Sequence, residues 1–579
     1  MDKYLAKNTR VKWLTLTMMF GVVVLVVRLF QIQILMHDEY TAKAYAEQVK
    51  KLIIPAKRGL IYALDNGTPT PLVLNTTVYK MFIDPVVIKD EAAVKAALYS
   101  EARDNILQEN KLNEKFQNKT SRYQVVANDL TRAQAEAIRA KKLVGVGFQA
   151  LSKRIYPEGD LAAQVLGFVN ANGGQYGVEG GLNERLTGKD GILESVTDIS
   201  KVPLTIGEQN THIPAKHGDN LVLTIDKNIQ AQTEKIARET AQRLSVDNIS
   251  VVVMNPNNAK VLAMANYPGY DPNNYAKVSE VALFNNPITM VPYEPGSVIK
   301  TFTVAMGINE GIIKPETTFY NSDSVKVADR TIVNAVRGHT GNVSMQAVLD
   351  YSLNTGVVEI LARAGGGQIN SKAINLFYSY LHDRFRFGEL TGIEIPETKG
   401  LIVGPTAQDG NAVRYSNMSF GQGMNLTMLQ VVTAYSAMVN GGKYYQPTIV
   451  AGIINDTGEY IVASEKEPTG QIVKAETSAT MRQMMSQSRK ADGTGRTDRI
   501  GFEVGGKTGT SETLRDGTYI KTQTIASYLG YGGGAKPEYV IMVQVGAKDR
   551  YLTGTTHAAP IFSELSNWLL TYMKIQAKE

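Results

Sequence analysis

The residues of this chain best suited to chemistry are a serine and a lysine three positions apart, Ser297 and Lys300. Pro295-Gly296 interrupts regular structure before them, and the apolar run after them predicts a helix that begins at or near Ser297. Residues three apart share one face of a helix, so the Lys300 amine can reach the Ser297 hydroxyl. A serine needs a base to attack a carbonyl group, and a lysine can serve when burial or a nearby cation lowers its pKa. Taken alone the pair is weak evidence, because ordinary composition produces it by chance.

Two further polar motifs follow in the chain. The first, Ser352-Leu353-Asn354, stands at the end of an apolar helix, where a simple helix-terminating turn is the competing interpretation. The second, Lys507-Thr508-Gly509-Thr510, follows two glycines and precedes the last strands. Its glycines would let a substrate backbone lie close to a strand, while the lysine and threonine side chains offer donors for a terminal carboxylate.

The second motif also overlaps a phosphate-binding pattern. Residues 501–508 match G-x-x-x-x-G-K-[ST] letter for letter. That pattern requires a buried strand before the loop and a helix after it. Here a polar, glycine-containing run stands before the loop, and a turn signal at residues 516–517 follows it. We therefore expect no nucleotide binding.

The first 40 residues predict a membrane anchor. Residues 13–27 are almost unbroken apolar sequence and apolar residues continue past Arg28, so the segment 13–36 reaches the roughly 20 residues that a span needs. Four basic residues precede the span, so residues 1–12 should form a cytoplasmic tail. The alternatives are a buried core helix and a cleaved signal peptide. The triplet Ala44-Tyr45-Ala46 lies well past the apolar stretch, whereas cleavage sites normally adjoin it.

Composition narrows the remaining classes of protein. A chain of 579 residues should form two to four domains. The net charge of +6 is spread along the chain without a basic stripe, so nucleic acid is not an expected partner. There are no cysteines, which excludes disulfides and thiolate chemistry, and the six histidines show no metal-ligand spacing. We expect neither a metal site nor a cofactor.

The rest of the chain shows two different patterns of predicted helices and strands. Residues 37–215 alternate short strands and helices, including a helix over 131–142 with Thr131 as its N-cap, and should form a separate non-catalytic module. Residues 216–579 begin and end with strands, at 220–225, 249–254, 260–265, 525–531 and 539–545. Helices are expected at 228–244, 298–308, 345–353, 428–439 and 560–573. This order predicts an α+β domain in which helices flank one antiparallel sheet, together with an all-helical part.

The order S-x-x-K, S-x-N, K-T-G resembles the three active-site motifs of β-lactamases and penicillin-binding proteins. Three other stretches are similar to class B, monofunctional penicillin-binding proteins: Arg154–Gly159, Gly177-Val178-Glu179 and Phe420-Gly421-Gln422-Gly423. The likeness runs from the anchor to the C-terminal helix. One stretch departs from it, because the family's usual Arg-Gly-x-Ile-x-Asp-Arg reads here as residues 58–65, Arg-Gly-Leu-Ile-Tyr-Ala-Leu-Asp.

The resemblance implies a peptidoglycan D,D-transpeptidase that is inhibited covalently by β-lactams. Ser297 would attack the penultimate D-Ala carbonyl of a stem peptide, with Lys300 as general base. Ser352 would relay a proton to the leaving amine, and Asn354 would bind the substrate amide. The terminal carboxylate would lie on Lys507 and Thr508, in the same motif as Gly509. The backbone N–H groups of Ser297 and Thr510 would form the oxyanion hole.

The resemblance also implies partners and a location. Residues 37–215 would be a pedestal or dimerisation-type module that binds a polytopic glycan polymerase in the membrane, and residues 216–579 would be a transpeptidase domain outside the cytoplasm. Three alternatives stay open. A β-lactamase or carboxypeptidase would pass the acyl group to water, a bifunctional synthase would need an acidic glycosyltransferase site within 37–215, and a non-catalytic scaffold would have little reason to keep every motif.

Overall fold

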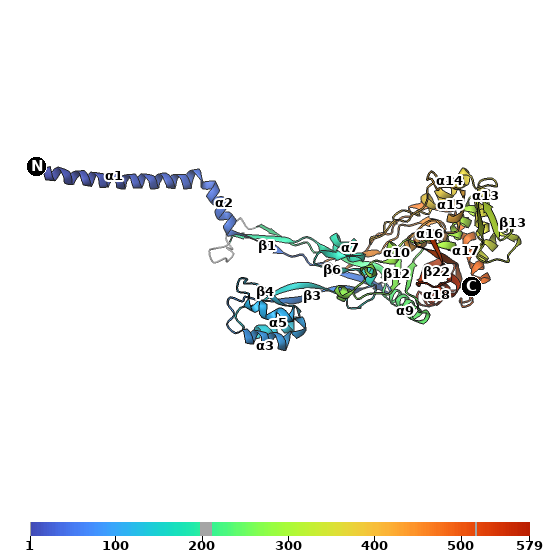
Figure 1. The fold of residues 1–579 in the computed structure, drawn as a ribbon, viewed down its shortest axis with the longest axis horizontal. Helices are drawn as coiled ribbons and strands as arrows, with labels where there is room; N and C mark the ends of the chain where they lie inside the picture. The colour runs from blue at the N-terminus through green and yellow to red at the C-terminus, as the bar shows by residue number, and fades with distance from the viewer. Residues whose placement is uncertain (1, 197–210, 516–517, 579) are drawn as a thin grey trace. The chain divides into compact units, whose positions relative to one another are not determined.

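The computed structural model describes residues 2–196, 211–515 and 518–578 (Figure 1). The turn signal at residues 516–517 lies outside the described residues. Contacts divide the chain into two compact units. The smaller unit comprises residues up to 58 and the described part of 187–218, and the larger unit comprises 59–186 and 219 to the C-terminus.

The smaller unit begins with α1 (Asp2–Phe30), which continues as a π-helical turn over Gln31–Leu35. Within residues 9–35, an 18-residue window has a mean hydropathy of 2.2 and is wholly exposed, so this helix fits a single-pass membrane anchor. After α2 (His37–Gln48), a three-stranded sheet has the order β1-β8-β9. Its strands are β1 (Val49–Ile54), β8 (Gly191–Val196) and β9 (Thr211–Ile213).

In the larger unit, strands from both sides of residue 216 share one seven-stranded sheet. Its order is β19-β18-β10-β2-β3-β4, with β5 also paired to β3. The strands are β2 (Ile61–Asp65), β3 (Thr68–Ile83), β4 (Gln124–Leu130), β5 (Val146–Ile155), β10 (Asn220–Asp226), β18 (Val450–Ile454) and β19 (Tyr460–Val462). Because β10 runs parallel to β2 and antiparallel to β18, the sheet joins N-terminal and C-terminal sequence directly.

Strands β3, β4 and β5 carry three small helices on a core of their own. These are α3 (Glu91–Glu101), α4 (Leu112–Gln117) and α5 (Arg132–Ala140). The predicted helix over 131–142 is confirmed as α5. The Thr131 side chain caps this helix by accepting a hydrogen bond from the Gln134 N–H, and the Gln134 side chain accepts one from the Thr131 N–H in return. Two N–H groups at the start of the helix thereby gain partners.

The second large sheet is antiparallel and has the order β12-β11-β23-β22-β21. Its strands are β11 (Asn248–Met254), β12 (Val261–Tyr267), β21 (Glu503–Arg515), β22 (Thr518–Gly533) and β23 (Pro537–Gly546). Strand β21 could not be predicted from the sequence, because three glycines and several polar residues hide the usual strand pattern. Pairing with β22 along its length makes it a strand.

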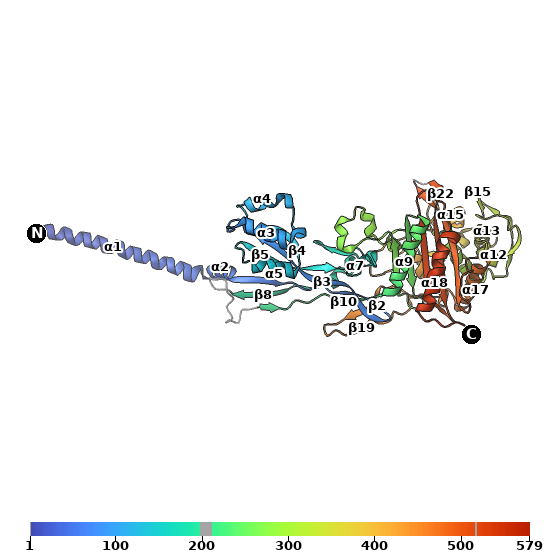
Figure 2. The same cartoon turned by 90° about the horizontal axis from the view of Figure 1, so that it is seen from below.

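Helices cover both faces of this five-stranded sheet, as the α+β prediction requires. On one face lie α9 (Lys227–Leu244) and α18 (Ala559–Tyr572), which share an apolar core with the strands (Figure 2). The other face is packed by α16 (Met428–Val439) and α17 (Ala475–Ala491), and α11 (Lys300–Asn309) packs against α17. Every residue of α16 is buried, which explains why it is apolar all round.

A mainly helical part completes the larger unit. Its helices are α12 (Met345–Asp350), α13 (Asn354–Ala364), α14 (Ser371–Ser379) and α15 (Ala412–Ser419). Two small two-stranded sheets precede them, the pair β13 (Thr318–Asn321) and β16 (Gly341–Ser344) and, between these strands in the chain, the hairpin of β14 (Ser324–Val327) and β15 (Arg330–Val333). The predicted helix over 345–353 ends three residues early, at Asp350, so Ser352 lies in the connection between two helices.

Candidate active site

Ser297 lies in a short 3-10 turn, Gly296–Ile299, that leads directly into α11. Its side chain is partly accessible, whereas Lys300 is only 1% exposed. The Lys300 Nζ atom lies 3.0 Å from the Ser297 Oγ atom, which is the contact that their three-residue spacing predicts. The structure therefore presents a reachable hydroxyl beside a buried amine.

The same amine joins the second motif to the first. Its Nζ atom lies 3.1 Å from the Ser352 Oγ atom and donates a hydrogen bond to the Ser352 carbonyl oxygen, 2.5 Å away. Ser352 has a φ of +55°, a left-handed conformation that is uncommon for a residue other than glycine. Such backbone conformations cluster at functional sites, where the surrounding structure holds them in place.

The third motif lies on β21, at the edge of the five-stranded sheet. Lys507 is 1% exposed, and its Nζ atom lies 3.2 Å from the Thr508 Oγ1 atom. Opposite it on β22 is Leu529, and Gly509 faces Ser527. Since the strand continues to Arg515, no helix follows Lys507, and the phosphate-binding pattern over 501–508 lacks the local structure it needs.

Two glycines let β21 touch the turn that carries Ser297. Gly296 has a φ of +63°, and a Cβ atom there would lie 2.9 Å from the Thr510 carbonyl oxygen. A Cβ atom at Gly509 would lie 2.2 Å from the Ser527 Oγ atom and 3.1 Å from the Pro295 carbonyl oxygen. The positive φ and the close backbone contact favour glycine at Gly296, and a side chain at Gly509 would crowd both β22 and the turn, so the two glycines let β21 approach the turn that carries Ser297.

Burial, together with neighbouring charges, shifts the pKa values of the two lysines. Burial lowers the pKa of Lys300 well below its usual value, and the charge of Lys507 lowers it further. Burial also lowers the pKa of Lys507, to about 8, although Asp492 and Asp350 oppose that change. At neutral pH the arrangement favours a neutral Lys300 amine, which can accept a proton, beside a Lys507 that is mostly protonated.

Asn354 begins α13, and its side chain also supports the neighbouring hairpin. Its Nδ2 atom donates a hydrogen bond to the Val333 carbonyl oxygen, 2.8 Å away. The next residue, Thr355, donates its backbone N–H to the buried Asn334 side chain and its hydroxyl to the buried Asn321 side chain. The hairpins therefore hold the N-terminus of α13, and with it Asn354, in position.

Glu294, three residues before Ser297, was not among the site residues predicted from the sequence. It is 8% exposed, and its Oε1 atom accepts hydrogen bonds from the Gly423 N–H at 2.8 Å and the Tyr519 hydroxyl at 2.9 Å. Its Oε2 atom is buried and has no hydrogen-bond partner among the described residues. Burial raises the pKa of this carboxyl. Nothing in the local sequence marks Glu294 among the 55 acidic residues of the chain.

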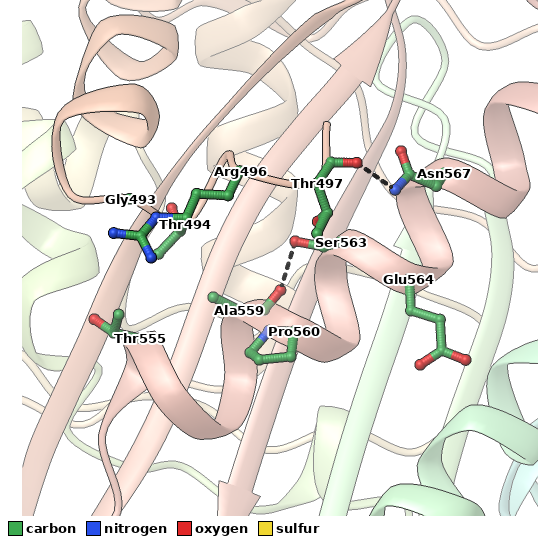
Figure 3. A pocket seen from close by; sticks show the side chains of 10 residues that line it. All are labelled: Gly493, Thr494, Arg496, Thr497, Thr555, Ala559, Pro560, Ser563, Glu564 and Asn567. Atoms are coloured by element: carbon green, nitrogen blue, oxygen red, sulfur yellow. Dashed lines mark hydrogen bonds between the residues drawn. The ribbon is translucent and has the colours of Figure 1, made fainter. Parts of the chain in front are cut away.

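A hollow of about 380 Å³ lies elsewhere, between the loop 493–497 and α18 (Figure 3). Its best candidate for a nucleophile is Ser563. That hydroxyl accepts a hydrogen bond from the buried Arg489 guanidinium and donates one to the Ala559 carbonyl oxygen. Since Ser563 is held by these structural contacts, the cluster of Ser297, Lys300 and Ser352 is the better candidate for an active site.

A serine and a lysine on one turn, a second serine in contact with the same amine and a K-T-G edge strand match the arrangement of motifs listed for β-lactamases and penicillin-binding proteins. Residues 249–567 match the family described as penicillin binding protein transpeptidase domain, and residues 53–223 match the penicillin-binding protein dimerisation domain. The chain belongs to the class B penicillin-binding proteins.

Individual relatives agree with this assignment. The chain is 30% identical over 567 residues to stage V sporulation protein D of Bacillus subtilis. The aligned region covers 96% of this chain and 84% of the relative. It is 26% identical over 588 residues to the peptidoglycan D,D-transpeptidase FtsI of Buchnera aphidicola. The aligned region covers 99% of this chain and 98% of that relative. Its fold is similar to that of penicillin binding protein 2X from Streptococcus thermophilus, with a TM-score of 0.71 at 22% identity. The superposition covers 91% of this chain and 80% of that structure.

Proposed function

We propose that this protein is a peptidoglycan D,D-transpeptidase that cross-links stem peptides through an acyl-Ser297 intermediate. The observation that carries the proposal is the position of the buried Lys300 amine, 3.0 Å from the Ser297 hydroxyl oxygen and 3.1 Å from that of Ser352. The activity named for the Buchnera relative supports the choice of substrate.

The contacts of Lys300 support its role as the base in the first step. A neutral amine has two hydrogens and one lone pair. The two hydrogens can go to the carbonyl and hydroxyl oxygens of Ser352, which leaves the lone pair to accept the Ser297 proton. As that proton moves, the Ser297 Oγ atom bonds to the penultimate D-Ala carbonyl carbon. The bond to the terminal D-Ala nitrogen then breaks, and the proton reaches that nitrogen from Lys300 through the Ser352 hydroxyl.

The edge strand supplies the groups that would hold the substrate. A protonated Lys507 and the Thr508 hydroxyl, only 3.2 Å apart, would bind the terminal carboxylate, and Gly509 lets the strand lie close to the nucleophile. The backbone N–H groups of Ser297 and Thr510 would stabilise the oxyanion, and Asn354 would bind the substrate amide. An amine from a second stem peptide then takes the acyl group from Ser297.

The proposal includes a location and a partner. Residues 1–12 would lie in the cytoplasm because they are basic, residues 13–36 would cross the membrane, and the catalytic domain, residues 216–579, would lie outside. Residues 37–215 would form the non-catalytic module that binds a polytopic glycan polymerase. No cofactor takes part in the proposed chemistry, and neither nucleic acid nor nucleotide is a partner.

The reaction with penicillin tests this function. A strained β-lactam amide mimics the scissile peptide bond, so we expect intact-protein mass spectrometry to show one adduct that persists for many minutes. Ser297→Ala should abolish the adduct, whereas Ser322→Ala, a change at an exposed serine, should leave it intact. An adduct that clears within seconds with turnover of the drug would identify a hydrolase. Labelling that survives in Ser297→Ala would show that another residue is the nucleophile.

A further inference from the structure

A second cavity of the larger unit, of about 860 Å³, is not used by the steps above. One wall is the tip of the β14–β15 hairpin, residues 328–332. A second wall is formed by Asp409, residues 411–414 and Asn417, where α15 begins. The third wall is formed by Gly423 and Tyr519. Figure 2 labels β15, α15 and β22, the elements that contribute to these walls. The volume falls in the range of ligand-binding sites and is large enough for a short peptide.

Hydrogen bonds tie the walls of this cavity to two of the catalytic motifs. The hairpin that forms the first wall continues into Val333, and the Val333 carbonyl oxygen accepts a hydrogen bond from the Asn354 side chain. On the other side, the Gly423 N–H and the Tyr519 hydroxyl both donate hydrogen bonds to the carboxylate of Glu294, which lies three residues before Ser297. The Gly296 N–H also donates to the Gly421 carbonyl oxygen, at 3.0 Å. The cavity is therefore bracketed by the Ser297 turn and the start of α13.

The lining carries charges of both signs. Asp329 and Arg330 lie exposed at the hairpin tip. Asp409 and Arg414 form an ion pair at 2.6 Å, and Arg414 also donates to the Gly423 carbonyl oxygen at 3.3 Å. Such a mixture suits a ligand that carries both ammonium and carboxylate groups, rather than an apolar one.

We propose that this cavity seats the acceptor peptide, the amine-bearing substrate of the second step. The inference rests on the proposed transpeptidase function. The donor's carboxylate would occupy the Lys507 strand, so a second peptide needs its own place from which to reach the same ester. Its nitrogen bonds to the acyl carbon, the ester bond to the Ser297 Oγ atom breaks, and the proton that the amine loses returns through Lys300 to that oxygen.

Two variants at exposed lining residues test the acceptor seat. Thr331→Trp would fill the cavity, and Arg330→Glu would reverse one of its charges. Lys326→Trp is the matched control, since Lys326 is an exposed residue of the same hairpin that does not line the cavity. For each protein, penicillin acylation measures the donor step. A thioester analogue of the stem peptide then measures hydrolysis and transfer to a peptide amine separately.

We expect both cavity variants to acylate with penicillin as the unchanged protein does, while transfer falls about tenfold or more relative to hydrolysis. The control should keep the original ratio. Unchanged transfer in both variants would overturn the proposal, and so would a loss of transfer that merely matches a loss of penicillin acylation. Failure of the unchanged protein to react with penicillin would instead overturn the transpeptidase function itself.

Discussion

The amine nitrogen of Lys300 lies 3.1 Å from the hydroxyl oxygen of Ser352, although the two residues are 52 positions apart in the chain. Their contact joins the start of α11 to the connection between α12 and α13. One buried amine thereby contacts two hydroxyls, and in the proposed mechanism this contact would give the proton taken from Ser297 a direct route to the leaving group.

Lys300→Met replaces the lysine with an unbranched side chain one atom shorter and removes the proposed base. We expect the rate constant for penicillin acylation to fall by about 10³-fold or more, because Ser297 loses its proton acceptor. Folding should be preserved, since methionine fills the same buried volume without an amine to desolvate. Stopped-flow acylation measures the rate and circular dichroism checks the fold. An acylation rate within a few-fold of the original would assign the base elsewhere.

The acylation rate should depend on pH with two limbs. Lys300 must be neutral to accept a proton, so the rate rises as pH increases through its lowered pKa. Lys507 must be protonated to hold the drug's carboxylate, so the rate falls as pH increases through its pKa of about 8. Lys507→Arg, which stays charged, should move the alkaline limb upward. A limb that stays near pH 8 in that variant would show that another group titrates.

Gly509→Ala should damage both stability and acylation. The added Cβ atom would lie 2.2 Å from the Ser527 Oγ atom on β22 and 3.1 Å from the Pro295 carbonyl oxygen beside the Ser297 turn, so β21 and its neighbours must shift at a cost of about 1–3 kcal/mol. Gly269→Ala is the control, because the nearest atom there is 3.9 Å away. Adding Ser527→Ala should restore part of the loss, since it removes the closest contact. Thermal unfolding and acylation rates measure both effects, and absence of rescue would contradict this steric explanation.

A buried ion pair should stabilise the part of the larger unit that lies before residue 186. Arg154 and Glu179 are 5% and 0% exposed, with 2.7 Å between the Nε and Oε1 atoms. Glu179→Ala would leave the guanidinium buried without its carboxylate, at a cost of about 3–5 kcal/mol. Glu136→Ala breaks an exposed pair with Arg132, which water screens, and should leave the stability nearly unchanged. Similar Tm values for the two variants would contradict this ranking.

A reporter fused after residue 60 tests the proposed orientation. We expect it to be active only outside the cytoplasm, because the basic residues before the anchor favour a cytoplasmic N-terminus. A fusion in which Lys3, Lys7, Arg10 and Lys12 are all replaced by glutamate serves as the comparison and should lose the preferred orientation. Cytoplasmic activity of the unchanged fusion would contradict both the orientation and the proposed substrate.

Elements with strong local signals could be predicted from the sequence. The expected helix over 428–439 is α16 to the residue, because Thr427 caps its start and Asn440-Gly441-Gly442 ends it. By contrast, β21 has little strand propensity of its own and exists because β22 lies beside it. Glu294 was equally hidden, since its burial depends on Gly423 and Tyr519, which are far away in the chain.

The sequence by itself determined the three motifs, their order and the helical spacing that puts Lys300 beside Ser297, because these depend on residues close together in the chain. Only the tertiary structure decided that Ser352 reaches the same amine, because distant segments had to pack together first. Burial then lowers the pKa values of Lys300 and Lys507, and a pKa responds to the dielectric and charges of the whole surrounding fold.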